Sequence, residues 1–204
     1  MPLIKYNNQS LSAITSLPSA IPTGKLKLIS SQTASNSASI SFTTGLDSTY
    51  KIYKFVFVNI HPATDDVDFT FNLSTDGGSN YNVTKTTTFF WSGHWEDDSQ
   101  TRFEYRDDFD LAQSTSNQII IRQIGNDSDQ NGSGTLTLFN PSSTTYVKHF
   151  IATTNDAQSS NISFNGFIAG YANTTSAINS AIFRMSSGNF DGTIYLYAID
   201  NSWV

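Results

Sequence analysis

The chain has 204 residues, of which 11 are Lys or Arg and 17 are Asp or Glu, so its net charge is −6. This acidic balance argues against nucleic-acid binding, which normally needs a basic surface. The absence of cysteine excludes disulfides, thiol nucleophiles and thiolate metal sites, and no run of about 18 apolar residues is present to form a transmembrane helix.

Residues 1–24 differ in composition from the rest and are predicted to form an N-terminal arm. Leu11, Ile14 and Leu17 recur every third residue, as on one face of a short helix that the two following prolines would end. We expect these side chains to dock on a partner, or alternatively on the chain's own sheet. Because the N-terminus lacks the apolar core of a signal peptide, release by lysis is favoured over secretion.

Residues 25–204 are predicted to form one all-β domain, because strand signals recur along the whole segment with turn residues between them. The expected fold is a two-sheet antiparallel sandwich, with a jelly roll as the favoured form. A trimeric fibre tip of the same architecture would give the same pattern. The strands are expected near 26–30, 38–42, 51–60, 68–73, 84–90, 118–124, 135–139, 146–153, 163–171, 181–185 and 193–199.

The segment 74–81 predicts a tight hairpin. Ser74, Asp76, Gly78 and Tyr81 have the spacing of an Asp-box, with tyrosine where tryptophan is usual. That motif is a structural turn in sialidases and some carbohydrate-handling β-proteins. A single copy therefore indicates a turn and carries no information about sugar binding.

The segment 89–100 is interpreted as a loop that could bind a ligand. Trp91 and Trp95 flank His94, and carboxylates follow, so the three side chains are candidates for a sugar-stacking platform. The favoured alternative is that these aromatic residues fill the core or a subunit interface. Paired carboxylates for glycoside hydrolysis are the least favoured reading, because nothing in the spacing fixes such a pair.

A partial calcium-binding pattern occurs at Asp127, Asp129 and Asn131, which precede a glycine as in the first half of a calcium loop. The bidentate glutamate expected later in such a loop is replaced by Leu138. An ordinary turn is therefore favoured over a calcium site. No other cofactor is expected.

The chain closes on a predicted β-hairpin over 181–199. Ile194, Leu196 and Ala198 alternate with Tyr195 and Tyr197, which indicates one buried and one outward face. We expect the strand at 181–185 to pair with this strand through the turn between them. The tyrosine face would then pack against a second sheet or a neighbouring subunit.

No catalytic motif accompanies these strands. His61, His94 and His149 lie in different predicted elements without zinc-ligand spacing. Neither a nucleophile elbow nor a nucleotide-binding loop occurs. No catalytic residue is therefore assigned, and we expect the protein not to be an enzyme.

Several phrases together resemble a group of tailed-bacteriophage structural proteins that are frequent among phages of aquatic bacteria. The phrases that carry the resemblance are residues 6–15, 28–35, 59–65, 74–81, 138–145, 173–179 and 181–199. The resemblance implies an exposed virion component on the capsid or on a tail appendage, and it brings no catalytic residues.

The expected function is therefore that of a structural protein on the virion surface, most simply a capsid decoration or cement protein. The expected partners are other virion proteins, and a homo-oligomer is expected, with a trimer favoured. No nucleic-acid or membrane partner is expected. The alternatives are a receptor-binding tail fibre or spike module that recognises a host surface glycan, and a depolymerase of cell-surface polysaccharide.

Overall fold

The computed structural model describes residues 26–199 and shows an all-β protein, as predicted. The arm residues Leu11, Ile14 and Leu17 lie outside the described part. No helix long and apolar enough to cross a membrane is found in 26–199. The strands are β1 (Leu26–Ser37), β2 (Ile40–Phe42), β3 (Ile52–Pro62), β4 (Val67–Ser74), β5 (Lys85–Trp95), β6 (Thr101–Tyr105), β7 (Gln118–Ile124), β8 (Gly132–Phe139), β9 (Lys148–Gln158), β10 (Ile162–Ala172), β11 (Ser180–Met185) and β12 (Phe190–Ile199).

The strands join in one antiparallel sheet that nearly closes into a barrel. Its hydrogen-bonded order is β1-β12-β3-β8-β9-β7-β4-β11-β2. The two end strands of this path, β1 and β2, follow each other in sequence, and the Gln32 side-chain amide on β1 donates to the Ser41 carbonyl on β2 at 2.7 Å. The predicted division into two jelly-roll sheets remains a prediction.

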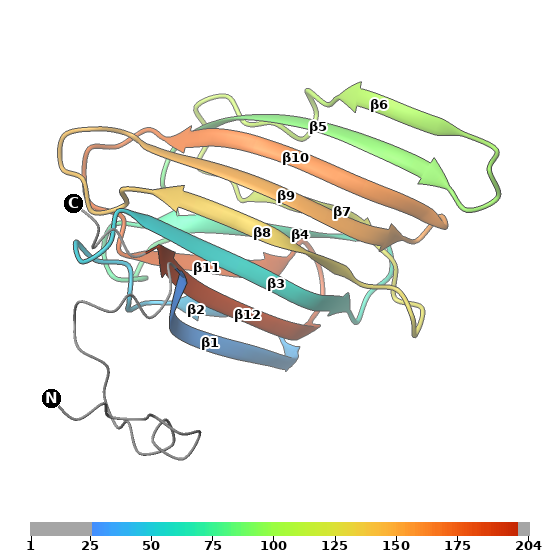
Figure 1. Ribbon diagram of the computed structural model, residues 1–204, viewed down its shortest axis with the longest axis horizontal. Coiled ribbons are helices and arrows are strands. Elements are labelled where there is room, and N and C mark those ends of the chain that lie inside the picture. The colour runs from blue at the N-terminus through green and yellow to red at the C-terminus, as the bar shows by residue number, and fades with distance from the viewer. Residues whose placement is uncertain (1–25, 200–204) are drawn as a thin grey trace, which may run out of the picture.

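The sheet branches at β9. On one side β9 pairs with β8, and on the other it pairs with β10 along its full length, after which β5 and β6 continue the sheet. The link from β9 to β7 is the single residue pair Gln158 and Ile124. Strands β7, β4, β11 and β2 lie behind the long row that runs from β1 to β6 (Figure 1). We call the side of this row that points away from those four strands the outer face.

The core between the two layers is built around Phe183 on β11. The centroid of its ring lies 4.9 to 6.4 Å from the centroids of five other phenylalanine rings. One comes from β2, two from β4 and two from β3: Phe42, Phe69, Phe71, Phe55 and Phe57. All six side chains are buried. Period-two alternation supplies them, since each strand sends every second side chain inward.

The predicted closing hairpin is wrong. Strand β11 pairs with β4 and β2, whereas β12 pairs with β1 and β3. The link between them crosses from one layer to the other, and its backbone bonds elsewhere: Ser186 N–H donates to the Asp68 carbonyl, and Asn189 accepts from Ala63 N–H. The predicted facing of β12 is confirmed, because Ile194, Leu196 and Ala198 are fully buried.

The predicted loop over 89–100 is mostly strand. Strand β5 continues to Trp95, a short turn follows, and β6 returns beside it. The reason is visible in the burial pattern, since Phe89 and Trp91 point into the core while Phe90 and Ser92 point outward. Strand β6 itself was not predicted.

Candidate functional site

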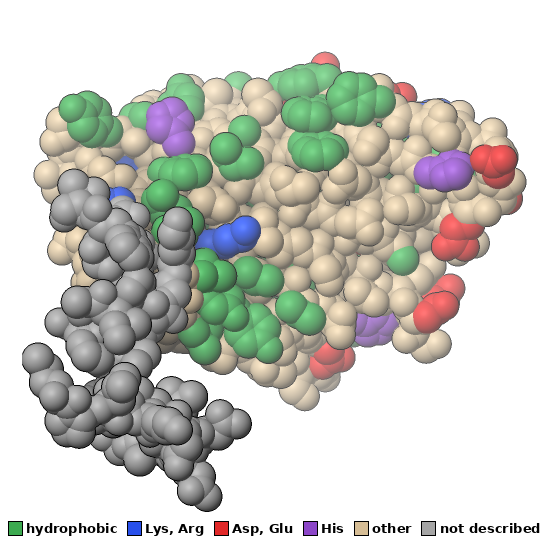
Figure 2. Space-filling view, in the orientation of Figure 1, with side chains coloured by type: hydrophobic (Ala, Val, Ile, Leu, Met, Phe, Trp, Pro, Cys, Tyr) green, Lys and Arg blue, Asp and Glu red, His purple; other side chains and the backbone are tan. Residues whose placement is uncertain are grey.

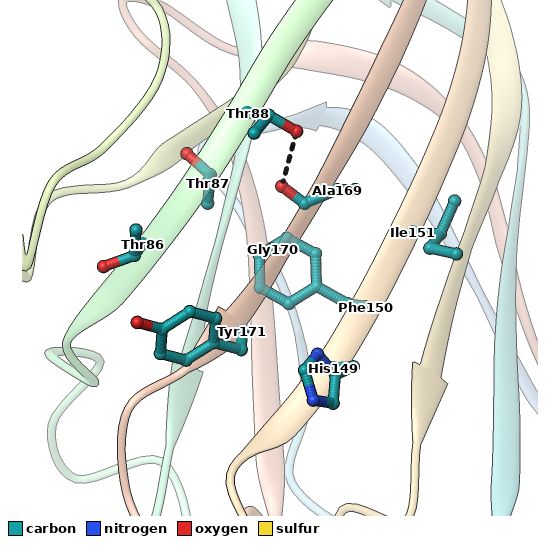
Figure 3. A pocket seen from close by; sticks show the side chains of 9 residues that line it. All are labelled: Thr86, Thr87, Thr88, His149, Phe150, Ile151, Ala169, Gly170 and Tyr171. Atoms are coloured by element: carbon teal, nitrogen blue, oxygen red, sulfur yellow. Dashed lines mark hydrogen bonds between the residues drawn. The ribbon is translucent and has the colours of Figure 1, made fainter.

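A hollow of about 450 Å³ lies on the outer face of β5, β10 and β9. Figure 3 shows side chains from all three strands around it. The residues that line it form three consecutive triplets, one per strand: Thr86, Thr87 and Thr88; Ala169, Gly170 and Tyr171; and His149, Phe150 and Ile151.

Strand register places these side chains in rows across the sheet. Tyr171 lies between Thr86 and His149, and Ala169 occupies the centre of the next row. The hollow exists because Ala169 is small while its outward neighbours on β10, Phe167 and Tyr171, are large. Aromatic rings therefore stand on either side of a short side chain.

The walls combine apolar surface with groups that can hydrogen-bond. The rings of His149 and Tyr171 have centroids 6.0 Å apart. The Thr86 hydroxyl accepts from the backbone N–H and the side-chain amide of Gln113, at 3.2 and 2.7 Å, and the Thr88 hydroxyl donates to the Ala169 carbonyl at 3.3 Å (Figure 3). Such a surface suits a ligand with an apolar face edged by hydroxyl groups.

Two buried lysines lie at the end of the same three strands, on the inner face. Lys85 and Lys148 are both paired with Ala172 in the sheet and are both fully buried. The Lys85 amine donates to the Asn72 side-chain oxygen at 2.6 Å and to the Val83 carbonyl at 2.8 Å. Burial lowers the pKa of Lys85 to about 8.

The Lys148 amine stabilises a neighbouring loop. It donates to the carbonyls of Thr174 and Ser176 at 2.9 and 2.7 Å, and burial lowers its pKa. Both lysines thus satisfy backbone or amide oxygens that folding removes from water. We infer that these two lysines stabilise the end of the sheet where the hollow lies.

An aromatic shelf, formed by Phe90, Phe103, Tyr105 and Phe167, adjoins the hollow on the same face. Phe90 stacks on Phe167 with centroids 5.0 Å apart, and Phe103 meets Phe90 edge-on at 5.6 Å. Phe103 is 72 % exposed and Tyr105 is 55 % exposed. Figure 2 shows hydrophobic side chains gathered over this part of the face and, separately, over β3 and β12.

The structure does not bring the predicted platform residues onto one surface. Trp91 is only 3 % exposed and stacks on Phe164 with centroids 4.6 Å apart. Trp95 is half-buried against the core, whereas His94 points to the outer face and bonds to Asp98 at 3.0 Å. Strand alternation puts His94 on the opposite face of β5 from Trp91 and Trp95, so the three side chains do not lie on one surface.

The sequence contains two acidic turns, one at Asp76 and one at residues 127–131. The carboxylate of Asp76 accepts from Ser74 and from two groups of Asn80, which lowers its pKa to about 2. The turn expected at 74–81 forms, but the expected hairpin does not, because β4 pairs with β7 and β11 whereas β5 pairs with β6 and β10. In the segment with Asp127, Asp129 and Asn131, backbone and side-chain bonds close an ordinary turn, and no cluster of three His, Asp or Glu side chains suited to a metal occurs within 26–199.

The residues around the hollow were not found from the sequence. His149 stood out only as one of three separate histidines, and nothing drew attention to Thr86 or Tyr171. Alternation in the predicted strands indicates which residues of each strand point outward. The pairing of β5 with β10 and β9, which joins them, has no signal in a single sequence.

The chain matches no protein-family model, and neither the curated proteins nor the solved structures contain a significant match.

Proposed function

We propose that this protein is a non-enzymatic structural component exposed on a tailed-phage particle, where it decorates or reinforces the capsid. The observation that carries the proposal is the apolar outer face around the hollow. Ile151 is 52 % exposed there, beside the aromatic shelf. Contiguous exposed apolar surface on a soluble domain marks an interaction site, whereas single exposed apolar residues do not.

The composition of this face supports a protein partner. Aromatic side chains are enriched at protein interfaces, while Lys, Glu and Asp are depleted there. Among the residues of the shelf and hollow, Phe90, Phe167, Ile151 and Tyr171 are uncharged, and the hydroxyls of the threonines provide the polar complement. The end-to-end resemblance to phage structural proteins supports virion proteins as the partner class.

The proposal includes two finer points. The protein acts as a symmetric homo-oligomer, for which a trimer is the favoured state. Its strands form a two-layer sandwich of jelly-roll type, which the arrangement of β7, β4, β11 and β2 behind the outer row supports. The partner-docking arm of residues 1–24 belongs to the same proposal, as does a location on the virion surface.

A second function, recognition of a host surface glycan by a tail appendage, is supported by the hollow. Tyr171 and His149 offer ring faces, and Thr86 and Thr88 offer hydroxyls around a space of about 450 Å³. Pockets of this size hold small ligands. Glycan recognition requires the hollow to be open on the particle, whereas capsid decoration requires the surrounding face to be covered by another virion protein.

Binding to emptied virions separates the two functions. Ile151→Ser and Phe167→Ser together should abolish binding to emptied virions if the apolar surface around the hollow docks on the particle. Val58→Ser, at another outward position that is 37 % exposed, is the matched control and should bind normally. Unchanged binding of the double variant, or no binding of the wild type, would overturn the decoration role.

Glycan binding is tested with Tyr171→Ala on host cells and on a glycan array. Loss of host-cell binding in this variant, with binding to emptied virions retained, would support the receptor-binding function. Circular dichroism spectra identical to the wild type are required of every variant.

A further inference from the structure

Strand β6 leaves one edge of the sheet open. It pairs with β5 on one side, and none of the strands in 26–199 pairs with its other side. Its five residues are largely exposed, with Phe103 at 72 %. An open edge presents unpaired backbone N–H and C=O groups, which can accept a further strand.

The direction of these backbone groups follows from the bonds at the two ends of the β5–β6 pair. Trp95 N–H donates to the Gln100 carbonyl, and Arg106 N–H donates to the Phe89 carbonyl. Hydrogen-bonded positions in an antiparallel pair recur at every second residue. Even-numbered residues of β6 therefore face β5, and Thr101, Phe103 and Tyr105 direct their backbone groups outward.

The charges on β6 are arranged symmetrically about Phe103. Arg102 precedes it and Glu104 follows it, and their side chains lie 3.5 Å apart on the same face of the strand. The Arg102 guanidinium also lies 5.7 Å from the centre of the Trp95 ring, which helps to fix its position. Charged residues on an edge normally oppose pairing, but here the two signs suit pairing of β6 with itself.

We propose that a second copy of this chain pairs antiparallel with β6 about a two-fold axis at Phe103. In this register Arg102 of each copy opposes Glu104 of the other. Phe103 occupies a hydrogen-bonded position opposite its own copy, as the outward direction of its backbone requires. Arg102 and Glu104 then occupy the non-hydrogen-bonded positions, where side chains approach most closely. This register pairs all five residues of β6.

The pairing joins the two sheets into one and extends the aromatic shelf across the axis. Phe103 and Tyr105 of each copy point to the outer face, so their exposed rings meet there. At the strand ends, Asp108 of one copy comes near Asp98 of the other, and the bonds from Arg106 to Asp108 in the same chain offset that repulsion. The interface is small, which predicts a weak dimer that forms at high concentration.

This inference goes beyond the proposed function, because it concerns the edge strand and needs no phage particle. It also differs from the favoured trimer, since the contact is two-fold. Failure of the dimer would leave the decoration role untouched, because the test of that role uses Ile151→Ser and Phe167→Ser on β9 and β10 and leaves β6 unchanged.

Charge reversal tests the register. Sedimentation velocity over a concentration series should show the wild type associating to a dimer. Arg102→Glu and Glu104→Arg should each remain monomeric, because each opposes like charges across the axis. An equimolar mixture of the two variants should recover the dimer, since every pair across the axis then has opposite signs. The double variant should also dimerise.

Arg184→Glu on the exposed part of β11 is the matched control for the change in net charge, and it should dimerise like the wild type. Phe103→Pro removes an outward N–H without touching the pairing with β5, so it should abolish the dimer while the protein stays folded by circular dichroism. A wild type that stays monomeric or forms a trimer, or single variants that dimerise as strongly as the wild type, would overturn the proposal.

Discussion

Lys85 should impose a distinctive pH dependence on folding stability. Its amine is fully buried and bonds to Asn72 and to the Val83 carbonyl, and no carboxylate of residues 26–199 is bonded to it. Burial without an opposing charge disfavours the charged amine, so its pKa falls from the ordinary 10.5 to about 8 in the folded protein. Lys85→Met removes the titrating group and keeps the length of the side chain.

Proton linkage gives the sign and the size of this pH dependence of the free energy of unfolding. Below about pH 8 the amine is charged in both the folded and the unfolded chain. Between about 8 and 10.5 the unfolded chain binds more protons, so the free energy of unfolding rises with pH. At a little over 1 kcal/mol for each pH unit, the interval between the two pKa values corresponds to about 3 kcal/mol.

Urea unfolding of the wild type and of Lys85→Met at a series of pH values gives the difference in their free energies of unfolding at each pH. The change of this difference with pH measures the contribution of Lys85. The lost hydrogen bonds to Asn72 and Val83 change the stability by the same amount at every pH and cancel. We expect the wild type to gain about 3 kcal/mol relative to the variant between neutral pH and pH 10.5. Lys51→Met, at an exposed position, is the control. A difference that does not change with pH would refute the reasoning.

Three further predictions concern the core, a buried carboxylate and the arm. Phe183→Ala should lower the free energy of unfolding in urea by about 3–5 kcal/mol because it empties the centre of the aromatic core, while Phe103→Ala should change it by less than about 0.5 kcal/mol; equal effects would contradict the core assignment. Asp156 is buried with no hydrogen-bond partner for its carboxylate within 26–199, and burial raises its pKa. Its neutral form is therefore favoured in the folded protein, so wild-type stability is full below the ordinary pKa of 3.8 and falls as pH rises through the raised value. Asp156→Asn should accordingly be more stable than the wild type at neutral pH and equal to it in acid, as measured by thermal unfolding; equal stability at both would contradict this. Deleting residues 1–24 should abolish binding to emptied virions while circular dichroism shows the sheet intact, and unchanged binding would rule out the arm as the docking element.

The sequence predicts well which side chains of a strand point into the core, but it predicts poorly which strands pair with each other. Alternation correctly places Ile194, Leu196 and Ala198 in the core, because hydrophobic burial acts on each strand separately. It gives no information on which strands pair, so β11 and β12 were joined in a hairpin that does not form. Both elements pair with strands far away in the chain instead.

The candidate site shows the same limit. Trp91 and Trp95 drew attention as large aromatic residues, yet their strand positions direct them toward the core. The hollow depends on Ala169, a small residue whose importance appears only when Tyr171 and His149 are placed beside it by strand pairing. Similarly, the symmetry of Arg102 and Glu104 about Phe103 has meaning only once β6 is known to be an edge.

Antibody labelling of intact phage particles in electron microscopy tests most directly whether this protein is a virion component. We expect an antibody against this protein to label the capsid, with many copies on each particle. Labelling confined to the tail would favour the glycan-binding function instead. Particles that carry no label, although the antibody recognises the purified protein, would contradict a virion role altogether.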